Sequence, residues 1–295
     1  MSKHLLCAII SFVALGCLIA SCGSGNSNAG DLRTDSTYVN RTEHLYGDTA
    51  MPACNLIISH TWITDADETA LRDSLNHMVQ LYTFGKEYAY MPVQEAIEKY
   101  GNDYVTDFRK DYEPLYAKEH MANAQNQDGQ TTNGSYTPNS WFNFFQKIET
   151  HTAFYYKHLL TFSIYREDYT GGAHGFYSTN FLNIDLRTLK TITLDDLLQG
   201  DYEEELTTLI EQRLMQDNNA ANADELYDMG YGTTGNIAPI DNFYLTPDGI
   251  TFHYNIYEIA PYVIGPIEVT VGFDKMKDML RNDYMIIDEL KGYNQ

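Results

Sequence analysis

The feature that most constrains the fold is a change in hydrophobic periodicity near residue 141. From Trp141 onward apolar and polar side chains alternate, most clearly over Leu160–Tyr165 and Phe181–Leu186. Successive side chains of a β-strand point to opposite faces, so this alternation predicts strands that bury one face. Residues Cys54–Trp62, which are rich in Ile, Leu and Thr, predict another strand.

Helical periodicity occupies other parts of the chain. Apolar residues recur at helical spacing over Leu71–Tyr82, after Pro92 and over Tyr202–Met215, and a short helix is expected at Asp274–Leu280. Together with the alternating stretches, this pattern predicts an α+β fold that has a mixed or antiparallel sheet and several packed helices.

Three local signals predict helix starts and a turn. Thr64 with Asp67, and Thr193 with Asp196, have the spacing of a capping box, in which two side chains satisfy free backbone amides. The segment Thr246–Gly249 contains proline and glycine between two apolar stretches, which predicts a hairpin turn with a positive φ at the glycine.

The amino-terminal residues have the layout of an export signal. Lys3 precedes an apolar run, Leu5–Ala20, that is short for a membrane span, which needs about 20 apolar residues. Ile19–Cys22 is similar to a bacterial lipobox, and Cys17 has a poorer context. We therefore expect a lipoprotein whose signal, residues 1–21, is removed and whose Cys22 carries the lipid; an ordinary secreted protein is the alternative. The expected location is the cell envelope, facing the periplasm or the cell exterior, with the membrane as a partner through the lipid.

The domain organisation predicted for the remaining chain has three parts. Residues 22–50 are polar and weakly patterned and are expected to form a flexible tether. An α+β segment over 51–150 precedes a second α+β domain over 151–295, with 51–295 as one compact unit the alternative. The polar stretch 123–139 is expected to be an exposed loop.

Cysteine content and charge exclude some classes. Removal of the signal and lipidation of Cys22 leave Cys54 as the remaining cysteine, so no internal disulfide is expected, and Cys54 is interpreted as a small buried residue. The formal charge of −22 disfavours nucleic acid and favours cationic proteins, although solubility also explains it.

Several motifs in the second half resemble one family. These are the run Tyr169–Gly175, the blocks Asn183–Leu186 and Ile192–Leu197, and then Phe243–Ile250 and Tyr257–Gly265. In this order they resemble the DUF3298-type domain, a domain of unknown function found in RsiV-like and PdaC-like proteins, over about residues 160–282. Its motif positions correspond here to Gly171, Gly172, Ala173, His174, Gly175, Asp185, Asp248, Gly249, Tyr257, Pro261, Tyr262 and Gly265.

The resemblance implies a mixed α+β module in the envelope, with binding as its activity. The RsiV anti-sigma factor recognises lysozyme, and the matching region of PdaC-type deacetylases is non-catalytic. In both a DUF4163-like companion segment precedes the domain, and residues 51–150 resemble it weakly. The expected partners are therefore a cationic, lysozyme-like protein or peptidoglycan. Neither RsiV-type transmembrane signalling nor deacetylation is expected, because the segments that perform them are not recognised in this sequence.

Candidate catalytic residues are few. The sequence contains no G-x-S-x-G, H-E-x-x-H or P-loop motif and no zinc-type cysteine spacing, so no metal or cofactor is expected. His174, with Asp168 and Glu167 upstream, is the candidate general base of an envelope hydrolase. The competing interpretation is that its glycine neighbours form a tight turn that the histidine braces. The sequence thus favours a binding module and keeps the hydrolase as the alternative.

Overall fold

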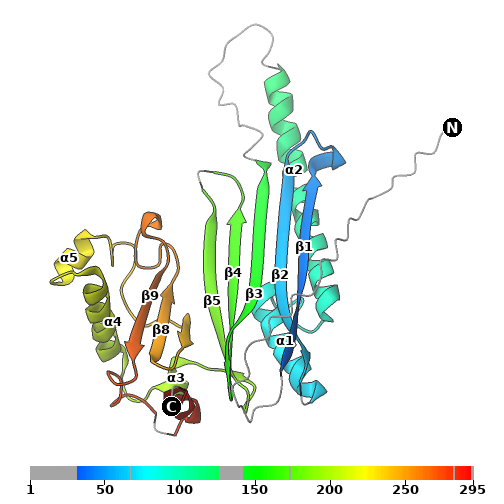
Figure 1. Ribbon diagram of the computed structural model, residues 1–295. Coiled ribbons are helices and arrows are strands. Elements are labelled where there is room, and N and C mark those ends of the chain that lie inside the picture. The colour runs from blue at the N-terminus through cyan, green and yellow to red at the C-terminus, as the bar shows by residue number, and fades with distance from the viewer. Residues whose placement is uncertain (1–31, 67, 126–141, 173, 282, 294–295) are drawn as a thin grey trace.

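A computed structural model describes residues 32–66, 68–125, 142–172, 174–281 and 283–293. Within these residues six strands form one sheet in the order β1-β2-β3-β4-β5-β6, and three form a second sheet, β7-β8-β9 (Figure 1). The strands of the large sheet are β1 Arg33–His44, β2 Ala53–Asp65, β3 Phe144–Tyr156, β4 Leu159–Tyr169, β5 Phe176–Asp185 and β6 Lys190–Thr191. The small sheet comprises β7 Phe243–Leu245, β8 Gly249–Tyr254 and β9 Ile267–Gly272.

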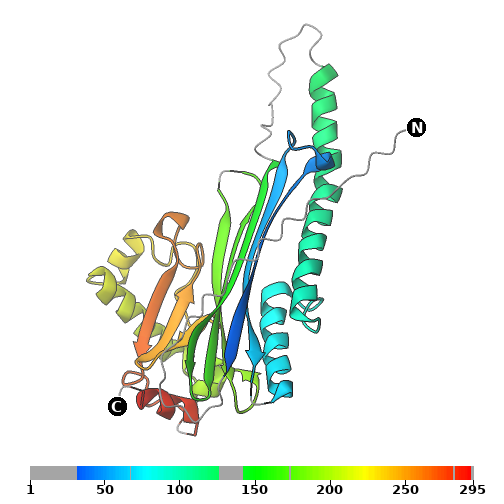
Figure 2. The same ribbon diagram turned by 45° about the vertical axis from the view of Figure 1, so that its right-hand side comes forward.

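The large sheet is mixed because β2 and β3 pair in parallel while its other described pairs are antiparallel. A parallel pair needs a long crossover connection, and two helices, α1 Thr69–Phe84 and α2 Val93–Gln125, lie between these strands in the chain. Both helices cover the same face of the large sheet, as Figure 2 shows. The predicted α+β fold with a mixed sheet and packed helices is confirmed.

The helix-covered face of the large sheet is apolar. Leu56 and Ile58 of β2 pack against Phe84 of α1 and Ile97 of α2. Nearer the other end of the sheet, strand residues pack against Leu75 and Val79 of α1; they are Ile63, Leu160, Phe162, Ile164, Leu182 and Ile184. These contacts explain why the alternating pattern carries its apolar residues on one side.

A second core surrounds the small sheet. It includes Leu206, Ile210 and Leu214 from α4, whose side chains contact buried residues of β8 and β9. The helices of this part are α3 Leu194–Leu197, α4 Glu203–Asn218, α5 Ala223–Asp228 and α6 Met285–Lys291, with a 3-10 turn at Tyr262–Ile264.

Asparagine side chains join the small sheet to the free edge of β5. The N–H of Phe181 donates to Asn242 Oδ1 at 2.9 Å, and the N–H of Thr179 donates to Asn255 Oδ1 at 2.7 Å. Asn242 Nδ2 in turn donates to the carbonyl oxygens of Thr179 and His253. Side-chain amides thus complete a strand edge that lacks a long neighbouring strand.

The predicted tether over residues 22–50 is wrong for residues 33–44, which form β1 and pair with β2 along its length. The strand is polar because it lies at a sheet edge, and its side chains are exposed or half-buried. The proposed boundary between residues 150 and 151 falls inside β3, and strands on both sides of it share one sheet.

Two of the predicted helix features are also wrong. Thr64 does not cap a helix, because it lies in β2, and α1 begins at Thr69. Residues Asp274–Leu280 form turns, and Gln199 donates its N–H to Met279 across a bridge to the α3 region.

Two other local predictions are confirmed and one falls mostly outside the described residues. The Asp196 carboxylate accepts the N–H and the hydroxyl of Thr193 at the start of α3. The hairpin β7–β8 forms around the predicted turn. Of the predicted loop over residues 123–139, residues 123–125 belong to α2 and the remainder is not described.

Cys54 is buried, as predicted, and burial raises the pKa of its thiol to about 11. No described helix has the length and apolar character that a membrane span requires.

Candidate functional site

Two motif segments that are far apart in the sequence meet in the structure. The loop between β4 and β5 contains Gly171 and Gly172, both with positive φ, at 92° and 98°. Gly175 is required for a different reason, since an added Cβ would lie 2.9 Å from the Asp168 carbonyl oxygen. The loop therefore holds a conformation that only glycine adopts easily, and it presents His174 to the segment that follows β8.

His174 is exposed and contacts aromatic residues from that second segment. Its Nε2 lies 3.3 Å from the hydroxyl of Tyr257, and its Nδ1 lies 3.0 Å from the carbonyl oxygen of Gly175. The imidazole also stacks on the ring of Tyr262, with 4.4 Å between ring centroids and 27° between ring planes. These contacts orient the side chain without burying it.

Further tyrosines extend this contact into a continuous set of rings, which we name the Tyr–His cluster. It consists of Tyr165 on β4, Tyr177 on β5, His174, Tyr257 and Tyr262, and successive rings lie within 6.5 Å. Tyr257 has a left-handed backbone, with φ of 68°, and is 42% exposed. Strain of this kind in a non-glycine residue often marks functional segments.

Tyr165 and Tyr177 were not predicted as members of this surface. Their positions in alternating strands did contain a signal, because both lie on the face opposite the one through which Leu160, Phe162 and Ile164 pack against α1. The pairing of β4 with β5 sets Tyr165 opposite Thr179, two residues from Tyr177 and on the same face, and so brings the two rings to the same region.

The two carboxylates proposed to assist His174 contact other residues instead. Glu167 Oε2 accepts the hydroxyl of Tyr165 at 3.0 Å, and Asp168 Oδ1 accepts Nε2 of Gln146. Gln146 also contacts Tyr100 of α2, which places Asp168 on the helix-covered face. In the described part of the chain no hydrogen bond or ion pair joins His174 to a carboxylate, so the proposed base and its orienting acid are not assembled.

The cluster has acidic neighbours. The pKa of Tyr165 is raised, first by burial, then by its hydrogen bond to Glu167 and by the charges of Glu167 and Glu149. Lys147 pairs with Glu149 at 2.8 Å and lies 5.5 Å from the centre of the Tyr165 ring. A ring surface with two carboxylates and one lysine beside it suits a partner with positive charge.

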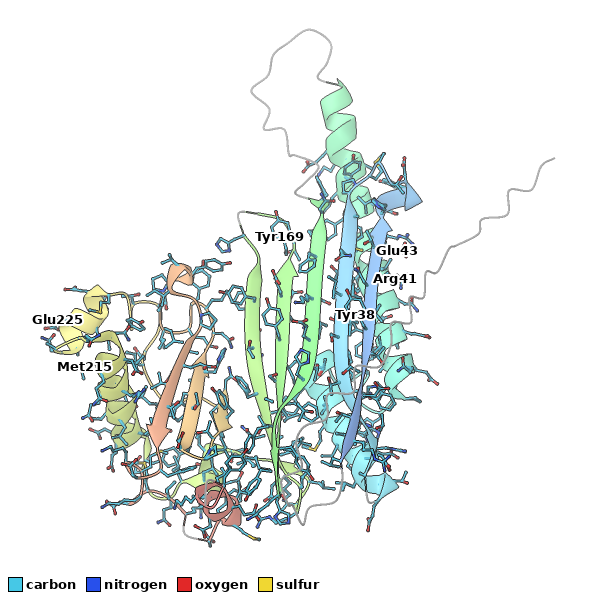
Figure 3. All side chains as sticks on the ribbon, viewed as in Figure 1. Tyr38, Arg41, Glu43, Tyr169, Met215 and Glu225 are labelled. Atoms are coloured by element: carbon cyan, nitrogen blue, oxygen red, sulfur yellow. The ribbon has the colours of Figure 1, made fainter. Side chains whose placement is uncertain are left out.

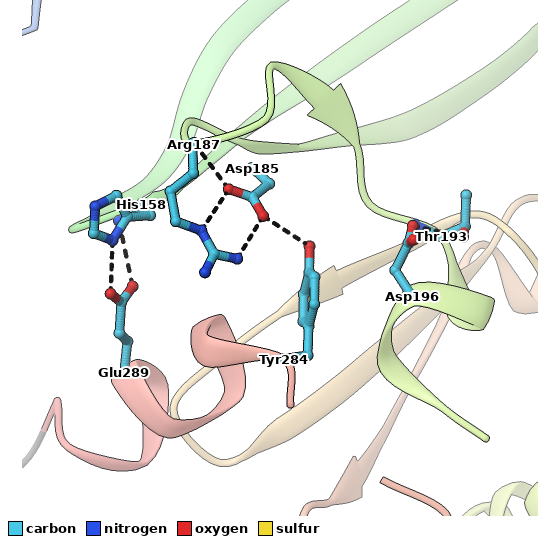
Figure 4. Close-up of polar contacts among 7 residues, drawn as sticks. All are labelled: His158, Asp185, Arg187, Thr193, Asp196, Tyr284 and Glu289. Atoms are coloured by element: carbon cyan, nitrogen blue, oxygen red, sulfur yellow. Dashed lines mark hydrogen bonds and ion pairs between the residues drawn. The ribbon is translucent and has the colours of Figure 1, made fainter. Parts of the chain in front are cut away.

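The other motif residues have structural roles. Asp185 is 2% exposed and accepts two hydrogen bonds from the Arg187 guanidinium and one from Tyr284 (Figure 4). Burial raises the pKa of this carboxyl, but the hydrogen bonds from Arg187 outweigh it and hold the pKa below its usual value. The same close-up shows His158 paired with Glu289 of α6 at 2.6 Å.

Glycines at two further motif positions are required for two different reasons. Gly249 does not have the positive φ that we predicted; an added Cβ there would lie 2.0 Å from the Val271 carbonyl oxygen, so close strand packing requires the glycine. Gly265 has φ of 82° and ends the 3-10 turn that Pro261 begins. Ala173 lies outside the described residues.

Comparison with known proteins identifies the family. The model of DUF3298, described as a protein of unknown function, matches residues 195–274. The crystal structure of a DUF3298 family member from Bacteroides fragilis NCTC 9343 is 42% identical, covers 90% of this chain and 100% of its own, and has a TM-score of 0.82. The chain belongs to the DUF3298 family.

Two other relatives share less with this chain. The crystal structure of a DUF3298 family protein from Pseudomonas aeruginosa PAO1 is 16% identical, covers 86% of this chain and 96% of its own, and has a TM-score of 0.58, so the likeness is one of fold. The peptidoglycan-N-acetylmuramic acid deacetylase PdaC of Bacillus subtilis strain 168 is 26% identical over 129 residues, which are 43% of this chain. The match spans 27% of that relative's length.

The matched DUF3298 region does not contain the whole Tyr–His cluster. Tyr257 and Tyr262 lie within residues 195–274, whereas Tyr165, His174 and Tyr177 precede them. The cluster therefore combines residues from inside and outside the region that the DUF3298 model matches. The DUF4163-like interpretation of residues 51–150 stays a prediction.

Proposed function

We propose that this DUF3298 chain is a cell-envelope lipoprotein whose folded part is a non-catalytic binding module, with the Tyr–His cluster as its recognition surface. The observation that carries the proposal is that His174 is exposed, stacked on tyrosine and without a carboxylate partner among the described residues. Pre-ordered aromatic rings at a surface are typical of binding, since they give contact area at little conformational cost.

The partner we favour is a cationic protein of the lysozyme type. The formal charge of −22 steers cations toward the whole chain, and Glu149 and Glu167 add negative charge beside the rings. The resemblance to the lysozyme-recognising region of RsiV supports the same choice.

A glycan of the cell wall is the second candidate. It is supported by the similarity to PdaC, whose name includes peptidoglycan, and by the exposed rings of Tyr257 and His174, on which a sugar could stack. The hydrolase alternative, with His174 as general base, has less support because Glu167 and Asp168 contact other residues.

Binding assays with the full chain separate these possibilities. Titration with a cationic lysozyme measures binding to the protein partner, and co-sedimentation with purified peptidoglycan measures binding to the glycan. Release of soluble fragments from peptidoglycan measures hydrolysis. Tyr257→Ala should weaken binding to the true partner by about tenfold or more, as is common for a central interface tyrosine. Tyr82→Ala is the matched control, because Tyr82 is 54% exposed on α1, away from the cluster.

Each result bears on the proposal. Lysozyme binding that weakens in Tyr257→Ala and declines with salt supports the cationic partner. Peptidoglycan binding with the same variant dependence supports the glycan. Fragment release that disappears in a stably folded His174→Ala protein would replace the binding proposal with the hydrolase.

A further inference from the structure

Strand β1 forms a long free edge of the large sheet. It contains 12 residues without proline, and within the described residues β2 is its one strand neighbour. Figures 1 and 2 show it at the outer side of the sheet, and Figure 3 shows Tyr38, Arg41 and Glu43 along it. Such an edge is a template for another strand unless it is short, bulged or covered.

Two hydrogen bonds show which backbone groups lie on the free edge. The N–H of Ser36 donates to the carboxylate of Asp35 at 2.7 Å instead of to β2. The carbonyl oxygen of Arg41, by contrast, points toward β2, where it accepts from the side-chain Nδ2 of Asn55 at 3.3 Å. Backbone groups alternate in an antiparallel ladder, so the even-numbered residues 34–42 direct their N–H and C=O groups outward.

The charges along β1 are antisymmetric about Tyr38. Arg33 and Glu43 stand five positions on either side of this tyrosine, and Asp35 and Arg41 stand three positions on either side. Charges at an edge ordinarily keep other strands away. When a strand pairs antiparallel with a copy of itself, however, mirror positions lie opposite each other, and here the opposed charges have opposite signs.

We propose that two copies of this chain form a two-fold symmetric dimer in which β1 pairs antiparallel with β1 of the second copy, with Tyr38 opposite Tyr38. In this register Arg33 lies opposite Glu43 and Asp35 opposite Arg41, twice each by symmetry. The outward groups of Ser36 meet those of Asn40, so the two sheets become one continuous sheet across the axis.

Two of the four charged side chains already have partners on α2. Arg33 pairs with Asp65 at 3.3 Å, with 72% and 56% of the two side chains exposed, and such an exposed pair contributes little to stability, so Arg33 can change partner readily. Arg41 contacts Glu43 at 3.1 Å and donates to Asn102 at 2.7 Å, and Glu43 also pairs with Arg109 at 2.9 Å. The Arg41 and Glu43 side chains keep 33% and 30% of their area exposed, which lets a charge across the axis act on them beside these partners.

The mass of the full chain in non-ionic detergent, measured by light scattering or sedimentation, gives the first test. We expect twice the mass of one chain. Tyr38→Pro should produce a folded monomer, since proline is tolerated where the N–H faces away from the neighbouring strand but cannot donate across the dimer axis. A wild-type monomer at all concentrations, or a Tyr38→Pro protein that is still dimeric, would overturn the proposal.

Cysteine substitutions test the register. Under mild oxidation Tyr38→Cys should form a disulfide-linked dimer, because opposed α-carbons in this pairing lie about 5.5 Å apart, within disulfide range. Asn40→Cys is the matched control, on the same face and edge of β1 but opposite Ser36, so it should not link to itself. A mixture of Ser36→Cys and Asn40→Cys should link. Equal linking by Tyr38→Cys and Asn40→Cys would contradict this register.

A charge reversal tests whether the opposed charges along β1 stabilise the dimer. Asp35→Lys places two lysines opposite Arg41 across the axis and should raise the dimer dissociation constant about tenfold, given the usual strength of cross-strand charge pairs. Asp48→Lys makes the same change in net charge outside β1, at an exposed position, and should leave the constant unchanged. The same dissociation constant in both variants would refute a role for the β1 charges.

Discussion

At the scale of single residues, His60 shows how burial makes stability depend on pH. It is 1% exposed, packs 5.0 Å from the Phe84 ring, and its Nδ1 has no hydrogen-bond partner within the described residues. Desolvation by burial lowers its pKa to about 4. The folded protein therefore holds this imidazole neutral, whereas the unfolded chain takes up a proton near pH 6.5.

We predict that this difference weakens the fold as the pH falls from 6.5 to about 4. In that window the unfolded state binds the extra proton, so the free energy of unfolding should decrease by about 1.4 kcal/mol per pH unit because of His60. Urea unfolding at several pH values measures the slope in the wild type and in His60→Leu. The variant should lack this contribution, and identical slopes in the two proteins would contradict the assignment.

Gly172 provides a second prediction at this scale. Its φ of 98° is unfavourable for any β-branched residue, although an added Cβ would meet no atom within 4 Å. Gly172→Val should therefore lower stability by about 1–3 kcal/mol through backbone strain alone. Thermal unfolding measures the change, with Gly101→Ala, inside α2, as a control that should not lower the melting temperature. An unchanged melting temperature in Gly172→Val would show that the loop adapts.

At the scale of elements, the attachment of the small sheet to β5 depends on side-chain amides. The Asn242 side chain accepts the N–H of Phe181 and donates to two carbonyl oxygens, those of Thr179 and His253. A buried backbone group that loses its partner costs about 1–3 kcal/mol. Side-chain amides therefore join the backbone of β5 to the small sheet at positions where no strand ladder connects the two described sheets.

We predict that Asn242→Leu destabilises the fold by about 3 kcal/mol or more, because it leaves several backbone groups of β5 and β8 unpaired. Hydrogen exchange should show faster exchange at Phe181, whose amide loses its acceptor. Asn180→Leu is the matched control, since Asn180 is an exposed residue of the same strand. Equal exchange rates at Phe181 in the two variants would contradict the proposed role of Asn242.

At the scale of the whole molecule, the helices α1 and α2 cover one face of the large sheet, and the small sheet packs beside β5 on the other side (Figure 2). The Tyr–His cluster lies where the β4–β5 loop meets the segment after β8. The proposed partner surface and the proposed β1 dimer edge are therefore at opposite sides of the large sheet, so both can be occupied together.

The proposed lipid anchor gives a prediction for the whole molecule, because such an anchor would place the module in the cell envelope. Cys22→Ser should abolish acylation and leave the precursor uncleaved, since the lipobox cysteine carries the lipid. Membrane extraction followed by mass measurement of the wild type and the variant tests this. A Cys22→Ser protein that still carries a diacylglycerol would contradict the assignment.

Local signals in the sequence determined the elements whose stability is mainly local. The alternation over β4 and β5, the helical spacing of α1 and α4, the Thr193–Asp196 cap and the β7–β8 hairpin all depend on neighbouring residues. The motif blocks likewise identified the family. These predictions succeed because strand and helix periodicities are properties of short segments.

Only the tertiary structure decided the rest. The polar segment Arg33–His44 is a strand because β2 supplies its hydrogen bonds and α1 and α2 cover Val39, neither of which its own sequence records. The expected helix over Asp274–Leu280 gave way to turns bridged to the α3 region, and His174 met tyrosines in place of Glu167 and Asp168. Strand pairing and loop contacts join residues far apart in the chain, so their outcome depends on which surfaces the whole fold brings together.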